Sequence, residues 1–168
     1  MLVRDLMSAR VVTVGMDDTV QAVTRLFEHH GFHHAVVLDD DRKMIGVVSD
    51  RDLLRATSPF VAKLAERPID VQTLARPIHQ LMSRRPITAM EDETVATAAH
   101  RMLELGCSCL PIVDHVGDLV GILTTRDILR MTAQTEAHTS SLRSSHQYPS
   151  RRPSIPPSLR SSHLPPGR

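Results

Sequence analysis

The chain has 168 residues, of which 41% are hydrophobic and only 2% aromatic, so its core must be built from aliphatic side chains. The formal net charge is +1, and this near balance of acids and bases gives no whole-chain argument for binding nucleic acid or a membrane. The N-terminus lacks the apolar core of a signal peptide, and no apolar run approaches membrane-spanning length. Cys107 and Cys109 are too close together for a disulfide that would stabilise the fold, which indicates a reducing compartment. We therefore expect a cytoplasmic protein that contacts neither nucleic acid nor membranes.

The first part of the chain predicts a unit with the order β-α-β-β-α, preceded by a helical turn. Its elements are expected at residues 3–7, 11–14, 19–30, 34–38, 44–48 and 50–57. The first long helix follows the acidic pair Asp17 and Asp18, which suits the positive end of a helix dipole. Gly31 then occupies the position of a left-handed helix stop.

The same order of elements returns in the second part of the chain. These elements are expected at residues 78–82, 86–89, 94–105, 109–113, 119–123 and 125–132. The linker between the two parts, 58–78, is punctuated by three prolines, and a short helix is expected in it at 60–66. Residues 134–168 are rich in Ser, Arg, His and Pro, a composition that cannot form a core, so we expect them to be disordered.

The two parts are copies of one unit. Shifting residues 4–55 by 75 positions lays them on 79–130 without a gap, as when Gly46 falls on Gly121. We therefore divide the chain into a first copy, a linker, a second copy and a tail, at 1–57, 58–78, 79–133 and 134–168. A unit of about 55 residues buries little apolar surface by itself, so we expect the copies to share a core by packing sheet against sheet.

Each copy carries one short polar motif at the start of its last helix. Ser49-x-x-Asp52 in the first copy returns as Thr124-x-x-Asp127 in the second. One interpretation is a helix capping box, a common pattern in ordinary helices. The other is a nucleotide site, in which the helix start and the arginine before each aspartate bind phosphate and the carboxylate binds a ribose diol. Capping is the simpler explanation of one copy alone, but the recurrence inside an in-register repeat favours binding in at least one of them.

The repeated segments resemble a known family. GVVSDRDLLR (46–55), LMSRRPIT (81–88), GCSCLPIVD (106–114) and GILTTRDILR (121–130) are similar to the motifs of a tandem pair of CBS domains, also called a Bateman module. The likeness covers roughly residues 1–132. It implies an α/β (α+β) fold of two β-α-β-β-α units packed sheet to sheet with pseudo-twofold symmetry, followed by the disordered tail.

The resemblance also implies ligand sites in the cleft between the units, because such modules commonly bind AMP, ADP, ATP or S-adenosylmethionine. Carried over, the first site comprises Val12, Thr13, His34, Ala35, Val36, Val48, Ser49, Arg51 and Asp52. The second comprises Ile87, Thr88, Cys109, Leu110, Pro111, Leu123, Thr124, Arg126 and Asp127. The family's proline is present as Pro111 but is replaced by Val36 in the first copy, where His34 is also bulky. Whether the first site is open is therefore left undecided, and Asp127 is the favoured ribose ligand.

No set of nucleophile, base and acid with supporting spacing is present, so we expect a regulatory module and not an enzyme, without a resident cofactor or metal. It would sense an adenine nucleotide, form a homodimer and signal to an unidentified protein in trans. One alternative is a metal- or redox-responsive protein that uses Cys107, Cys109 and the four histidines within 29–34. Another is a ligand-free scaffold whose basic tail recruits partners.

Overall fold

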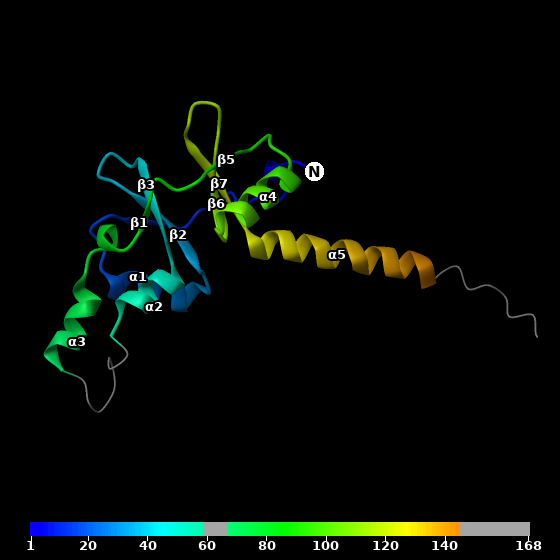
Figure 1. The fold of residues 1–168 in the computed structure, drawn as a ribbon. Coiled ribbons are helices and arrows are strands. Elements are labelled where there is room, and N and C mark those ends of the chain that lie inside the picture. The colour runs from blue at the N-terminus through cyan, green and yellow to red at the C-terminus, as the bar shows by residue number, and fades with distance from the viewer. Residues whose placement is uncertain (59–66, 145–168) are drawn as a thin grey trace, which may run out of the picture. The chain divides into compact units, whose positions relative to one another are not determined.

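The computed structural model describes residues 1–58 and 67–144 (Figure 1). Met1–Ala133 form one compact unit, which holds both copies of the repeat. The short helix expected at 60–66 and most of the expected disordered tail lie outside the described residues. In the described part of the chain, no helix combines the length and the apolar character needed to cross a membrane.

Both copies have the predicted β-α-β-β-α order. The elements of the first copy are η1 (Val3–Asp5), β1 (Thr13–Gly15), α1 (Val20–His30), β2 (His34–Leu38), β3 (Met44–Ser49) and α2 (Asp50–Ala56). Those of the second are η3 (Ile78–Gln80), β4 (Ser83–Arg84), β5 (Ala89–Met90), α4 (Val95–Leu105), β6 (Cys109–Val113), β7 (Leu119–Thr124) and α5 (Thr125–Ser144). The short strand β4 has no counterpart among the predicted elements.

The first long helix of each copy begins and ends through local chemistry. Thr19 Oγ1 accepts a hydrogen bond from the Ala22 amide at 3.2 Å and so caps α1; Thr94 does the same for α4. Gly31 and Gly106 end these helices with φ of 67° and 65°, a left-handed conformation that glycine adopts without a Cβ clash. The predicted stops are therefore confirmed, and a threonine caps each helix.

The last helix is longer than predicted. The sequence pattern predicts a helix at 125–132, but α5 continues to Ser144 and includes residues 134–144 of the expected disordered tail. The physical reason is that no glycine or proline interrupts residues 125–144, and the helix can propagate until a breaker is met.

The strands form two sheets that pack face to face. One sheet has the order β1-β2-β3-β4 and the other β5-β6-β7; β1 and β5 run parallel to their neighbours, whereas β2–β3 and β6–β7 are antiparallel. Because side chains alternate along a strand, one face of each sheet packs on its helices and the other on the opposite sheet. Val36 and Val47 of the first copy thus share a buried cluster with Cys109 and Ile122 of the second. This sheet-to-sheet contact forms the predicted pseudo-twofold centre.

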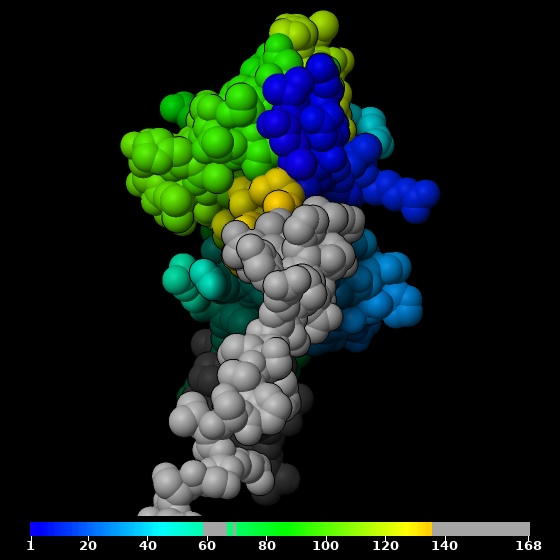
Figure 2. All heavy atoms as spheres, turned by 90° about the vertical axis from the view of Figure 1, so that its right-hand side faces the viewer, coloured from blue at the N-terminus to red at the C-terminus, as the bar shows by residue number. Residues whose placement is uncertain are grey.

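The two copies exchange their first segments. Val3 is fully buried in the helix-side core of the second copy, and the Ser8 amide donates to the Ile122 carbonyl of β7 at 2.9 Å. Reciprocally, Ile78 and Met82 pack in the core of the first copy, where β4 pairs with β3. In Figure 2 the dark-blue N-terminal residues lie on the green second copy. The limits of the sequence repeat therefore differ from the limits of the two cores.

Two glycines at equivalent repeat positions accommodate this exchange. A Cβ on Gly46 would lie 2.5 Å from Met82 Sδ, and a Cβ on Gly121 would lie 2.5 Å from Met7 Sδ. The methionine of each exchanged segment thus rests on a position in the other copy's strand that has no side chain.

The linker contributes α3 (Pro68–Gln72) and η2 (Thr73–Ala75). Asp70 of α3 is buried, and its carboxylate accepts hydrogen bonds from Arg67 Nε at 3.1 Å and from Ser58 Oγ at 2.7 Å. These bonds, with that of Arg67 contributing most, lower the pKa of Asp70 to about 2. The carboxylate therefore stays ionised and connects α3 to Ser58 at the start of the linker.

Candidate functional site

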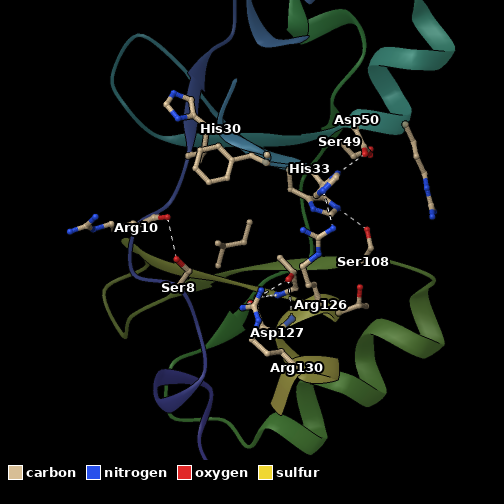
Figure 3. A pocket seen from close by; sticks show the side chains of 18 residues that line it. Ser8, Arg10, His30, His33, Ser49, Asp50, Ser108, Arg126, Asp127 and Arg130 are labelled. Atoms are coloured by element: carbon tan, nitrogen blue, oxygen red, sulfur yellow. Dashed lines mark hydrogen bonds and ion pairs between the residues drawn. The ribbon is translucent and has the colours of Figure 1, made fainter. Parts of the chain in front are cut away.

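A cavity of about 490 Å³ lies between the two copies of the repeat (Figure 3). This size is typical of small-molecule sites, which range over roughly 300–1,000 Å³. Most of its lining comes from the N-terminal segment, the turn after α1, and the starts of α2 and α5. Its residues are Ser8, Arg10, Val12, His30, Gly31, Phe32, His33, His34, Ser49, Asp50, Arg51, Ser108, Ile122, Thr124, Thr125, Arg126, Asp127 and Arg130.

The polar motif of each copy forms a capping box. Asp52 Oδ2 accepts hydrogen bonds from the Ser49 amide at 2.9 Å and from Ser49 Oγ at 2.6 Å. Asp127 Oδ2 has the same two bonds, at the same distances, with Thr124. The capping interpretation is therefore correct for both copies. Because the box uses one carboxylate oxygen, Oδ1 of each aspartate remains outside it.

The two aspartates have different surroundings despite their identical caps. Asp127 lines the cavity, and Arg130 Nη1 lies 3.4 Å from its Oδ1. Asp52 does not line it and instead borders a smaller hollow of about 290 Å³ beside Arg55. Only one of the two repeated motifs thus presents its carboxylate to the main cavity.

Seven of the residues that the family resemblance assigns to ligand sites (the carried-over residues) line this cavity, and they come from both expected sites. They are Val12, His34, Ser49, Arg51, Thr124, Arg126 and Asp127. Val12 reaches the cavity of Asp127 because the exchanged N-terminal segment pairs with β7. The structure therefore places Val12 with Asp127, whereas the carried-over sets place it with Asp52.

The other carried-over residues lie away from the cavity. They are Thr13, Ala35, Val36, Val48, Asp52, Ile87, Thr88, Cys109, Leu110, Pro111 and Leu123. Strand alternation explains several of them, since Ala35 and Leu110 face the helix-side cores and Val36 faces the opposite sheet. As ligand contacts, all of the carried-over residues remain predictions.

Several lining residues were not predicted from the sequence. They are Ser8, Arg10, His30, Gly31, Phe32, His33, Asp50, Ser108, Ile122, Thr125 and Arg130. Arg130 had a detectable signal, because it follows Asp127 by three residues and so shares its helix face. Ser8 and Arg10 had none, because only the exchange of segments brings them here.

His33 joins the two copies across the cavity. Its Nδ1 lies 2.8 Å from Asp50 Oδ2, and its Nε2 lies 2.9 Å from Arg126 Nη2. A guanidinium can only donate, so Nε2 accepts and the ring proton resides on Nδ1, which donates to Asp50. This bond lowers the pKa of Asp50 below its ordinary value. The His33 ring therefore holds the Arg126 guanidinium against the first copy.

The remaining histidines of the cluster have separate environments. His34 Nε2 lies 2.8 Å from Ser108 Oγ, and burial lowers the pKa of His34, which favours the neutral ring. His29 and His30 meet edge to face, and His30 stacks on Phe32 with ring centroids 5.5 Å apart. The four imidazoles do not converge, and within 1–58 and 67–144 no group of three or more His, Cys, Asp or Glu side chains is placed to hold a metal ion.

The two cysteines are free thiols. Burial raises the pKa of Cys109 to about 12 and also raises that of Cys107. Since the thiolate is the reactive form, these environments disfavour redox chemistry at neutral pH.

Comparison with known proteins identifies the repeated unit. The sequence model of the CBS domain matches residues 3–58 and again 78–133. A CBS domain-containing protein of Dictyostelium discoideum is 31% identical over 129 residues, which cover 76% of this chain and 88% of that protein. An L-aspartate semialdehyde sulfurtransferase of Methanocaldococcus jannaschii is 28% identical over 130 residues, but the match spans only 23% of that enzyme.

Solved structures show the same arrangement. The CBS domain pair of protein MJ0100, in complex with 5′-methylthioadenosine and S-adenosyl-L-methionine, has a TM-score of 0.67 and 26% identity; the match covers 80% of this chain and 98% of that one. CBSX2 in complex with AMP has a TM-score of 0.65 and 28% identity, with the same coverage of both chains.

Proposed function

Because this chain belongs to the CBS domain family, as a tandem pair of CBS domains, we propose that it is a regulatory module that binds an adenosine-containing nucleotide between its two copies. The observation that carries the proposal is the cavity of about 490 Å³ that contains Asp127 at the start of α5. The complexes of two similar CBS pairs with AMP, and with 5′-methylthioadenosine and S-adenosyl-L-methionine, support the class of ligand.

In this proposal Asp127 binds the ribose. Its Oδ2 is fixed by the two bonds to Thr124, so the carboxylate is held in place before the ligand arrives. Oδ1 lies outside the capping box and accepts from a ribose hydroxyl. A preorganised acceptor costs little conformational entropy on binding, which favours affinity.

The output of the module is a change passed to another protein. Ligand binding shifts the chain between two arrangements only to the extent that the ligand binds them differently. The cavity contacts both copies, so a bound nucleotide would change how one copy rests on the other. The proposal includes no catalytic step. The protein that the module regulates is a separate chain, so the effect is exerted in trans.

We also propose a homodimer. Leu54 on α2 and Leu129 on α5 occupy the same repeat position and are 74% and 69% exposed. Paired exposed leucines on equivalent helices are suited to an interface with a second copy of the chain, which would bury both.

Isothermal titration calorimetry of the purified chain with AMP, ADP, ATP, S-adenosylmethionine and adenosine tests the nucleotide proposal. At least one compound should bind, and Asp127→Ala should weaken it by about tenfold to a hundredfold, the usual cost of losing hydrogen bonds to a charged group. Asp52→Ala is the matched control, because it removes an identical capping box whose carboxylate does not line the cavity.

Two results would contradict the proposal. One is the absence of binding by every compound at millimolar concentration. The other is an equal loss of affinity in the Asp52 and Asp127 variants, since that would trace the effect to the helix cap and not to the ribose contact.

A further inference from the structure

A row of three side chains crosses the cavity from one copy of the repeat to the other. Asp50 Oδ2 lies 2.8 Å from His33 Nδ1, and His33 Nε2 lies 2.9 Å from Arg126 Nη2 (Figure 3). Asp50 and His33 belong to the first copy and Arg126 to the second, so we call this set of three residues the bridge. The side chains of His33 and Asp50 are 44% and 42% exposed, so water and protons can reach the ring.

The bridge requires one protonation state of its ring. A guanidinium has only N–H donors, so Nε2 of His33 must accept from Arg126, and it can accept only while it carries no proton. Nδ1–H can donate to Asp50 in both the neutral and the charged ring. Uptake of a proton at Nε2 therefore keeps the contact within the first copy. It places two N–H donors and two positive charges face to face at Arg126, so the contact between the copies is lost.

The ring is the member of the bridge whose charge changes in mild acid. The hydrogen bond with His33 lowers the pKa of Asp50 below its ordinary value, so this carboxylate stays ionised between pH 5 and 8. A guanidinium is always protonated in a protein, whereas histidine is the side chain that titrates in this range. The other charged or titratable side chains that line the cavity are Arg10, His30, His34, Arg51, Asp127 and Arg130.

Two of these neighbours have other partners than the bridge. Asp127, the one carboxylate among the six, bonds to Thr124 and to Arg130. His34 Nε2 lies 2.8 Å from Ser108 Oγ, and burial lowers the pKa of His34, which favours its neutral ring. Since His34 and Ser108 belong to different copies, their contact continues to join the copies when the bridge opens.

The repeat shows that the bridge belongs to one side of the molecule. The positions equivalent to His33, Asp50 and Arg126 are Ser108, Thr125 and Arg51. The hydroxyl groups of serine and threonine do not titrate between pH 5 and 8, so the second copy offers Arg51 no equivalent of the His33 ring. Arg51 is therefore an internal reference for Arg126.

We propose that the bridge is a pH-sensitive switch between the two copies, closed while His33 Nε2 carries no proton and open when that nitrogen is protonated. Opening releases the start of α5 from the first copy and turns the His33 ring into the partner of Asp50 alone. The switch needs no ligand, so it goes beyond the proposed nucleotide binding. It would make the arrangement of the two copies at this cavity depend on pH.

Nuclear magnetic resonance of the full chain without nucleotide, at pH values from 8 down to 5, tests the switch. Long-range proton–nitrogen spectra report which ring nitrogen of His33 carries the proton, and the guanidinium signals of Arg126 report its contact. At pH 8 the proton should reside on Nδ1. As the pH falls, Nε2 should gain a proton and the Arg126 signals should shift with the same midpoint, whereas the Arg51 signals should shift severalfold less.

Two variants separate the His33 ring from a general effect of acid. His33→Gln keeps a side-chain oxygen that can accept from Arg126 but cannot titrate, so the Arg126 signals should lose most of their pH dependence. His33 is exposed, so this replacement leaves the core intact. The matched control is His29→Gln, which removes a nearby imidazole that does not line the cavity and should leave the response of Arg126 unchanged.

Three results would overturn the switch. They are a His33 ring with its proton on Nε2 at pH 8, Arg126 signals that do not follow the titration of His33, and an Arg126 response that persists in His33→Gln. Each of them leaves nucleotide binding standing, and the absence of nucleotide binding would leave the switch standing.

Discussion

The thiol of Cys109 lies between the two sheets, in the buried cluster that also contains Val36, Val47 and Ile122. Removal from water disfavours the charged thiolate and raises the pKa of this thiol to about 12. Cys107, two residues earlier, is half-buried and its pKa is raised as well. At the scale of single residues, burial thus decides between a packing and a reactive role for these cysteines.

Alkylation kinetics test this difference. At pH 8 in native buffer, Cys109 should react with iodoacetamide roughly a hundredfold more slowly than in denaturant, because both the thiolate fraction and access are low. Peptide mass spectrometry after timed labelling gives the rate of each cysteine, and Cys107 serves as the less buried comparison. Fast native labelling of Cys109 would contradict the prediction and support the redox alternative.

Among the elements, the exchanged segments have the largest effect on stability. Val3 of η1 is fully buried among the side chains of the second copy, and Ile78 of η3 is fully buried in the first. Each copy therefore lacks part of its own helix-side core and receives it from the other. This explains why units of this size are stable as a pair.

Replacement of Val3 by alanine measures how much the exchanged N-terminal segment contributes to the stability of the second copy. We expect a loss of roughly 2 kcal/mol in the free energy of unfolding, within the range for truncating buried aliphatic side chains. Val116, which is 85% exposed in the turn before β7, provides the control, and its alanine variant should change stability little. Urea denaturation followed by circular dichroism gives both values, and an equal, small effect would show that η1 is not part of the second core.

At the scale of the whole molecule, the compact unit leaves several leucines uncovered. Leu54 and Leu129 lie at equivalent positions on α2 and α5, whereas Leu103 of α4, 82% exposed, has no such relation to them. The proposed homodimer would cover the first two. Apolar area removed from water contributes about 25 cal/mol per Å², so two leucines per chain can be central contacts of an interface.

Light scattering coupled to gel filtration tests this assembly. The unmodified chain should have the mass of a dimer at micromolar concentration, and Leu54→Glu or Leu129→Glu should convert it to a monomer by placing charges in an apolar contact. Leu103→Glu should leave the dimer intact. A monomeric unmodified chain, or dissociation by Leu103→Glu alone, would contradict the proposed interface.

The sequence by itself determined the local features of this protein. The repeat, the order of strands and helices, the glycine stops at Gly31 and Gly106 and the capping boxes of Asp52 and Asp127 all follow from neighbours along the chain. The resemblance of the repeated motifs to CBS domains identified the family from the same local patterns. The one local feature that the sequence pattern predicts wrongly is the end of α5, because the polar composition of 134–144 favours disorder whereas no glycine or proline interrupts the helix there.

Only the tertiary structure decided which copy supplies each wall of the cavity. An in-register repeat allows a segment such as 3–8 to pack on its own copy or on the other one, and the sequence pattern is the same in both cases. The exchange brings Ser8 and Arg10 to Asp127, and the sheet-to-sheet contact brings His33 to Arg126. It also leaves Asp52, which has the same cap as Asp127, outside the main cavity. These contacts join residues far apart in the chain, so they depend on how the copies pack and not on the order of their residues.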